Sequence, residues 1–174
     1  MIAKRFLALA AVSALALSAC SSNSAPTDAD CAKAEVLCVG LVTDLGKVDD
    51  KSFNQSAWEG AKAAAEEAGG ISKYVETVDT KDYAANIKQF TDKSYDVIVT
   101  VGFLMADATV AAAKANPNTK FIGVDQFQGE TVDNLTGLIF PEDQAGYAAG
   151  YLAGLMTKRS EEHTSELQSL RHLV

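Results

Sequence analysis

The stretch "VLCVGLVTDLGKVDDKSFNQSAWEGAKAAAEEAGG", residues 36–70, reads as a complete strand, loop and helix. Its first part, residues 36–44, is short, apolar and rich in valine, which predicts a buried parallel strand. Ser52 and Gln55 have the spacing of a capping box at a helix start. Gly69 follows the alanine-rich segment as a helix stop. The stretch therefore predicts the first strand and the first helix of an α/β fold.

The same alternation continues to residue 158. Pro141 suits the first position of the last helix, and Gly146, Gly150 and Gly154 predict that this helix packs closely onto the sheet. Strands that alternate with helices predict a parallel sheet covered on both faces, with right-handed crossovers. We expect further strands at residues 71–79, 95–102, 119–126 and 134–140, and further helices at 81–93, 104–117 and 142–158.

Composition and motifs exclude several classes of function. Of the 174 residues, 48% are apolar, which is enough for a core, and the net charge of −8 argues against a nucleic-acid partner. Both histidines, His163 and His172, lie near the C-terminus, so residues 35–158 offer no histidine base. The chain has neither a G-x-S-x-G nucleophile elbow nor a G-x-G-x-x-G dinucleotide loop after its first strand. We therefore expect a binding protein without cofactor or metal, not an enzyme.

Residues 1–20 have the features of a bacterial lipoprotein leader in their usual order. Lys4 and Arg5 precede an apolar run shorter than the roughly 20 residues that a membrane span needs. The run ends in "LSAC", which resembles a lipobox, so we expect Cys20 to be lipidated and to become the new N-terminus. Residues 21–34 read as a flexible polar tether. The mature protein is thus expected at the extracytoplasmic face of the cell membrane, held there by its lipid anchor.

The last residues, "RSEEHTSELQSLRHLV" (159–174), do not resemble a protein family; they resemble a translated sequencing adapter. We expect this tail to be non-native and residues 35–158 to form the folded lobe. The alternative is a genuine amphipathic tail with a leucine stripe.

Cys31 and Cys38 are the two cysteines that follow Cys20. The six residues between them are enough to close a loop, and export permits a disulfide. Cys38 also lies inside an apolar run, where a buried free thiol is equally ordinary. The sequence leaves both states open.

Candidate binding residues stand where the predicted strands end, because ligands of open parallel sheets bind outside the carboxyl ends of the strands. Asp44 ends the first strand, Gly102 the third and Asp125 the fourth, while Phe53 opens the first helix. An aromatic ring offers a stacking face, and carboxylates accept hydrogen bonds from hydroxyl or N–H groups. Asn54 is expected either to contact the ligand or to anchor the loop. We expect these five residues to bind a flat, hydroxyl-bearing molecule, and the acids to repel phosphate.

Structural roles are the alternatives for the same positions. Asp44 would then cap a turn, Phe53 would act as a hydrophobic staple, and Asp125 would form a turn. The charges at residues 49–51 are expected to be solvated loop charges.

Three stretches resemble the basic membrane lipoprotein family, the substrate-binding proteins of nucleoside ABC importers similar to the purine-nucleoside receptor A group. They are "VGLVTDLGKVDDKSFNQSAWEGAKAA" (39–64), "KFIGVDQ" (120–126) and "EDQAGYAAGYLAG" (142–154).

The resemblance implies the N-terminal lobe of a type I periplasmic-binding-protein fold. It implies that a nucleoside base stacks on Phe53, that Asp44 and Asp125 make polar contacts, and that an ABC permease is the partner. A second lobe would follow Lys158, so we expect this chain alone to bind nucleoside weakly or not at all. Tight binding in calorimetry would refute that expectation.

Other functions remain open on the sequence alone. The same fold serves receptors for other small molecules, such as a sugar or a signalling molecule, and sensory lipoproteins. From a different class, a calcium-dependent nucleoside hydrolase needs an aspartate cluster near its first strand, which "DLGKVDD" (44–50) superficially offers.

Overall fold

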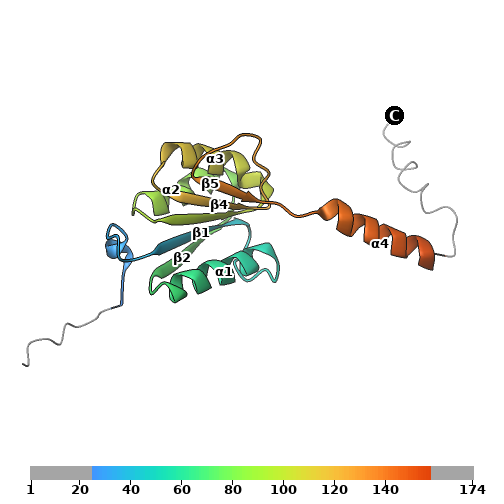
Figure 1. Ribbon diagram of the computed structural model, residues 1–174, viewed down its shortest axis with the longest axis horizontal. Helices are drawn as coiled ribbons and strands as arrows, with labels where there is room; N and C mark the ends of the chain where they lie inside the picture. The colour runs from blue at the N-terminus through green and yellow to red at the C-terminus, as the bar shows by residue number, and fades with distance from the viewer. Residues whose placement is uncertain (1–24, 158–174) are drawn as a thin grey trace, which may run out of the picture.

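The computed structural model describes residues 25–157, and its centre is one five-stranded parallel sheet (Figure 1). The strands lie in the order β2-β1-β3-β4-β5. The predicted parallel α/β architecture is confirmed, with element ends that differ from the predicted ones by a few residues. The strands are β1 (Cys38–Leu45), β2 (Ile71–Thr77), β3 (Val97–Val101), β4 (Lys120–Val124) and β5 (Leu135–Leu138). The helices are α1 (Phe53–Glu67), α2 (Tyr83–Thr91), α3 (Ala106–Ala115) and α4 (Glu142–Met156), with short 3₁₀ turns η1 (Asp28–Asp30), η2 (Thr80–Asp82) and η3 (Phe103–Met105).

Helices cover both faces of the sheet, α1 on one side and α2 with α3 on the other (Figure 1). Under α1, Ala65 of the helix and Leu41 of β1 belong to one buried cluster. On the opposite face, Ile87 and Phe90 of α2 belong to a second buried cluster. Gly40 permits that packing, because a Cβ there would lie 2.6 Å from the Phe90 ring. The two clusters pack the sheet tightly between its helices. The carboxyl ends of the strands are therefore held in fixed positions.

Helix α1 begins with a different cap from the predicted one. The Ser52 side chain makes no capping hydrogen bond. Instead, the Asp50 carboxylate accepts the backbone N–H groups of Ser52 at 2.8 Å, Asn54 at 3.1 Å and Gln55 at 3.0 Å. Burial raises the pKa of Asp50, but these N–H groups outweigh it and hold the pKa below its usual value. The predicted capping box is therefore wrong, and Asp50, although exposed as predicted, also caps the helix.

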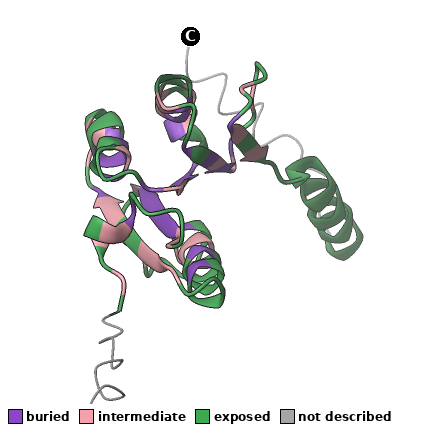
Figure 2. Cartoon of the chain, turned by 60° about the vertical axis from the view of Figure 1, so that its left-hand side comes forward, coloured by how far each residue is buried: buried purple, intermediate pink, exposed green. Residues whose placement is uncertain are grey.

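Helix α4 extends away from the sheet, contrary to the predicted packing (Figures 1 and 2). All of its residues are exposed, and no atom lies within 4 Å of a Cβ added at Gly146, Gly150 or Gly154. The sheet faces are already occupied by α1, α2 and α3, and the chain leaves the edge strand β5 before α4 begins. Pro141 stands just before this helix as its N-cap, one position earlier than predicted. Among residues 25–157, no helix has the length and hydropathy of a membrane span.

The N-terminal segment is bonded to the sheet from residue 28 onward, within the range 21–34 that was predicted as a tether. The Asp28 carboxylate bonds Lys73 at 2.7 Å, Lys93 at 3.0 Å and the Tyr95 hydroxyl at 3.0 Å. A disulfide joins Cys31 to Cys38, with the Cα atoms 5.5 Å apart. The leader with Cys20 and the tail at residues 159–174 lie outside the described residues.

Asp28→Asn should lower the melting temperature at pH 7 by roughly 2–5 °C. The hydrogen bond from Lys73 is the largest of the contacts that lower the pKa of Asp28 from 3.8 to about 2, although burial opposes it. Because the folded-state pKa is depressed, this stabilisation is present above pH 4 and is lost as pH falls toward 2. Calorimetric melting curves across this range should show the two proteins converging at the acid end. Asp92→Asn, at an exposed pair with Lys88, is the matched control, and an equal loss there would contradict the account.

Candidate functional site

Three of the five predicted site residues lie at adjacent strand ends. Asp44 is near the end of β1, Gly102 directly follows β3 and Asp125 directly follows β4. These strands are neighbours, and the strand order reverses between β1 and β3, which is where open α/β sheets bind ligands. We call Asp44, Phe53, Gly102 and Asp125 the rim.

The backbone at the rim is unusual at two positions. Gly102 has a φ of 93° and Asp125 a φ of 59°, both in the left-handed region. The Gly102 N–H donates to the Val124 carbonyl at 2.9 Å, which ties the two strand ends together. Non-glycine residues in this region cost energy and gather at functional sites. Aspartate adopts this region more readily than most residues, and the backbone here sets the direction of the Asp125 side chain at the rim.

Asp44 is held at its side chain and at its backbone. Its Oδ1 accepts the Tyr83 hydroxyl at 2.6 Å, and its N–H donates to the Asn54 amide oxygen at 3.0 Å. Its Oδ2 faces Gly102, where an added Cβ would lie only 2.3 Å away. Burial, followed by the bond to Asp44, raises the pKa of Tyr83, so the phenol stays a donor. The result is a fixed carboxylate at the end of β1.

Asn54 lies behind the rim. The residue is 3% exposed, and both ends of its amide are used, because Oδ1 accepts from the Asp44 N–H and Nδ2 donates to the Lys47 carbonyl at 3.2 Å. Of the two predicted roles, this placement favours anchoring of the loop over contact with a ligand.

Phe53 projects its ring toward solvent and is not sealed in the core. The residue is 44% exposed, and its ring meets that of Phe140 edge to face, with centroids 5.3 Å apart. The two rings line a hollow of about 430 Å³ together with Val124 and Leu138, at the carboxyl ends of β4 and β5. We call it the rim hollow. It offers an apolar, aromatic wall that suits a flat ligand, and neither Asp44 nor Asp125 lines it.

The surroundings of Asp125 disfavour its charged form and raise the pKa of its carboxyl group. Burial raises its pKa first, the Glu142 carboxyl at the start of α4 raises it further, and the Asp44 charge adds to both. Asp44 and Asp125 are therefore close enough to interact, as expected for neighbours on one rim.

Asp125→Asn should stabilise the folded chain at pH 7, by roughly 1–3 °C in melting temperature, while weakening ligand binding. The pKa of Asp125 is higher in the folded chain than in the unfolded chain. Its contribution to stability is therefore fully present below the unfolded-state pKa and is lost as pH rises through the folded-state pKa. At pH 7 the wild type carries this cost and the amide does not. Asparagine also tolerates the left-handed backbone. Differential scanning fluorimetry at pH 3–8 checks this against exposed Asp133→Asn, and a lower melting temperature for Asp125→Asn would contradict it.

Sequence reasoning missed two residues that support the rim. The helical spacing of Tyr83 predicts a core residue, and only the three-dimensional structure shows that its hydroxyl bonds Asp44. Gln126 is fully buried, and its Nε2 donates to the Thr100 hydroxyl and to the Gly102 carbonyl, each at 3.1 Å. This amide joins the loop after Asp125 to Gly102, and no sequence motif marked it.

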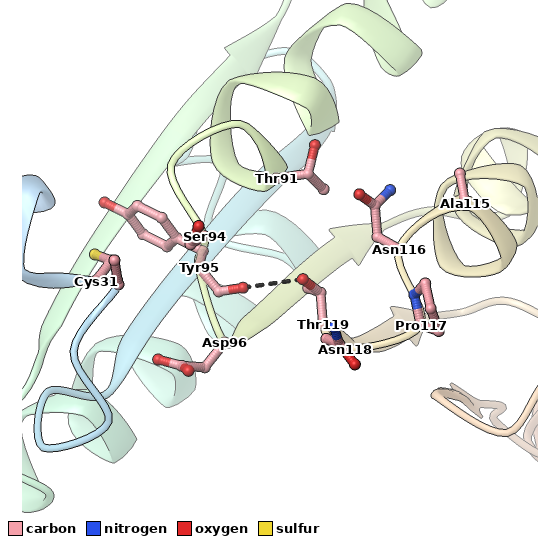
Figure 3. Close-up of a pocket in the computed structure, with 11 residues that line it drawn as sticks. Cys31, Thr91, Ser94, Tyr95, Asp96, Ala115, Asn116, Pro117, Asn118 and Thr119 are labelled. Atoms are coloured by element: carbon pink, nitrogen blue, oxygen red, sulfur yellow. Dashed lines mark hydrogen bonds between the residues drawn. The ribbon is translucent and has the colours of Figure 1, made fainter.

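A second hollow, of about 470 Å³, lies at the other end of the sheet (Figure 3). Tyr95 and Asp96 precede β3 and Thr119 precedes β4, so this hollow faces the amino ends of the strands. The Thr119 hydroxyl donates to the Tyr95 carbonyl at 3.2 Å across it. Because it is remote from the strand-order reversal, we do not assign the binding site to it.

The aspartates of residues 44–50 do not converge as a hydrolase site requires. Asp50 caps α1, and Asp44 bonds Tyr83. Within residues 25–157, no group of three or more metal-ligating side chains gathers. The hydrolase alternative loses the cluster on which it depended.

The fold and the rim together define a class: an α/β lobe that carries two carboxylates and an exposed aromatic ring at the carboxyl edge of a parallel sheet. Residues 38–164 match the Bmp family, described as "ABC transporter substrate-binding protein PnrA-like". The chain belongs to this family, as the sequence resemblance implied. It is a family of substrate-binding proteins, not of enzymes.

Two relatives illustrate the match. The chain is 34% identical over 165 residues to the "ABC transporter nucleoside-binding protein BmpA" of Lactococcus lactis, covering 92% of this chain and 46% of that protein. It is also 34% identical over 161 residues to the "CD4+ T-cell-stimulating antigen" of Listeria innocua, covering 89% and 45%. The chain thus spans about half the length of these relatives.

Solved structures share the fold. A solute-binding protein of an ABC transporter system from Aeropyrum pernix superposes with a TM-score of 0.60 at 29% identity, covering 66% of this chain and 31% of that one. A lipoprotein fragment from Peptoclostridium difficile gives a TM-score of 0.54 at 26% identity, covering 70% and 99%. The five-stranded sheet and its helices correspond to one lobe of the type I periplasmic-binding-protein fold.

Proposed function

We propose that the described lobe forms one wall of a nucleoside-binding site in the substrate-binding component of an ABC importer, with purine nucleosides as the preferred ligands. The observation that carries the proposal is the exposed ring of Phe53 at the same sheet edge as Asp44 and Asp125. The name of the Lactococcus relative, a nucleoside-binding protein, supports the same ligand class.

Each rim residue has a separate role in this proposal. Phe53 stacks on the base, for which its exposed ring and the apolar rim hollow are suited. Asp44 accepts a hydrogen bond from a ligand hydroxyl or N–H group. Gly102 leaves the room that the Asp44 carboxylate occupies at the site, and Asp125 supplies the second polar contact. Asn54 holds the loop between Asp44 and Phe53.

The proposed setting is the extracytoplasmic face of the membrane. The leader pattern supports lipidation of Cys20, and an ABC permease is the expected partner that takes the ligand from the cleft. The fixed segment around Asp28 lies at the amino ends of the strands, opposite the rim, so an anchor on the N-terminal side leaves the rim clear.

Saturation-transfer NMR with the 174-residue chain tests the ligand class. The method detects weak binding, which is what we expect when one lobe alone contacts the ligand. Inosine and adenosine should give signals strongest at the base protons, uridine weaker signals, and inosine monophosphate none, because the rim acids repel phosphate. Signals from a sugar and none from any nucleoside would reject the proposal in favour of a sugar receptor.

A further inference from the structure

We propose that Tyr83 is the positioning residue for Asp44, fixing the carboxylate so that Oδ1 is occupied and Oδ2 remains to accept from the ligand. The inference rests on the proposed function, because it assigns Asp44 to ligand contact. It adds helix α2, which contributes none of the rim residues, to the machinery that sets specificity.

The Tyr83 hydroxyl is placed by the core, independently of the ligand. Tyr83 is the first residue of α2 and is 4% exposed. Its side chain packs in the same buried cluster as Ile87 and Phe90. The 2.6 Å bond to Asp44 Oδ1 therefore comes from a rigid donor, and a phenol donating to a carboxylate makes a strong hydrogen bond.

A second set of bonds fixes α2 to the same sheet edge. One turn after Tyr83, the Asn86 amide donates to the Thr77 hydroxyl at 3.1 Å, and the Thr77 N–H donates to the Thr43 hydroxyl at 2.9 Å. Thr43 directly precedes Asp44. The start of α2 is thus bonded directly to the side chain of Asp44 and, through Thr77, to the strand residue before it, so a shift of the Tyr83 hydroxyl would also shift the rim.

The bond also restricts what Asp44 accepts. A carboxylate has only acceptor sites, and Tyr83 uses the Oδ1 side. The Oδ2 side packs against Gly102, so closely that a Cβ there would lie 2.3 Å from the oxygen. With Oδ1 bonded to Tyr83 and one side of Oδ2 closed by Gly102, a ligand donor must reach Oδ2 from the side away from Gly102, which makes Tyr83 a determinant of ligand orientation.

Tyr83→Phe removes the hydroxyl and keeps the packed ring, and Tyr95→Phe is its matched control. Tyr95 is 1% exposed, and its hydroxyl also donates to a carboxylate, that of Asp28 at 3.0 Å, at the opposite end of the sheet. Both variants should lower the melting temperature. In amide-detected NMR titrations with inosine, Tyr83→Phe should raise the Kd roughly fivefold or more, and Tyr95→Phe should leave it within twofold of wild type. In an Asp44→Asn background, Tyr83→Phe should add no further loss.

An unchanged Kd in Tyr83→Phe, with wild type binding inosine, would overturn the inference and leave the proposed function standing. If the wild type does not bind inosine, the proposed function fails, and positioning is still tested by the ¹³C resonance of the Asp44 carboxyl group. That resonance should move in Tyr83→Phe and stay in place in Tyr95→Phe. A resonance that is the same in wild type and Tyr83→Phe would overturn the positioning role directly.

Discussion

Gly102→Ala should abolish nucleoside binding and lower the free energy of unfolding by about 2 kcal/mol or more. The φ of 93° at this position is unfavourable for any residue with a side chain. The new Cβ would also lie 2.3 Å from Asp44 Oδ2 and 2.5 Å from its Cγ, so the carboxylate must leave its place. Backbone strain destabilises the fold, and displacement of Asp44 removes the ligand contact.

Urea unfolding and inosine titration, measured on the same samples, separate the two effects. Gly60→Ala is the control, because Gly60 lies within α1, and no atom is within 4 Å of a Cβ added there. Alanine at that helical position should stabilise the chain by up to about 1 kcal/mol and leave binding unchanged. Wild-type affinity in Gly102→Ala would show that the β3 end is not part of the site.

Phe53→Ala should weaken nucleoside binding by about 1–3 kcal/mol, which raises the Kd roughly 5- to 150-fold. Because the wild-type complex is already weak, binding by this variant should no longer be detected. The expected loss is that of one base stacked on one aromatic ring. The cost to the fold should be small, about 1 kcal/mol, because the residue is 44% exposed and its ring contact is the edge-to-face pair with Phe140.

Phe53→Tyr should retain binding, because the stacking face is kept. Phe127→Ala is the control for loss of an exposed ring, since Phe127 is 75% exposed in the loop after β4. Titration of all three variants with inosine distinguishes stacking from a general loss of apolar surface. Equal losses in Phe53→Ala and Phe127→Ala would contradict the stacking role.

The main features of the fold and most of the rim were predictable from local patterns. Valine-rich runs that alternate with helical segments predict a parallel α/β sheet. Because carboxyl ends of parallel strands meet at one edge, Asp44, Gly102 and Asp125 were expected together although they are far apart in the chain.

The supporting bonds were not predictable, because each depends on where a side chain ends in three dimensions. Helical spacing marks Tyr83 as buried but does not say which group its hydroxyl meets. Asp50 stands among loop charges, and only the path of the loop brings it to the first N–H groups of α1. Small residues in α4 suggested packing, yet which partner a helix meets is a tertiary property that spacing does not contain.

Amide mapping by ¹⁵N NMR shows which edge of the sheet binds inosine. We expect concentration-dependent shifts at Asp44, Phe53, Gly102 and Asp125, and none in the hollow at the amino ends of the strands around Asp96 and Thr119. Shifts confined to that opposite hollow, or an unperturbed rim at saturating inosine, would contradict it.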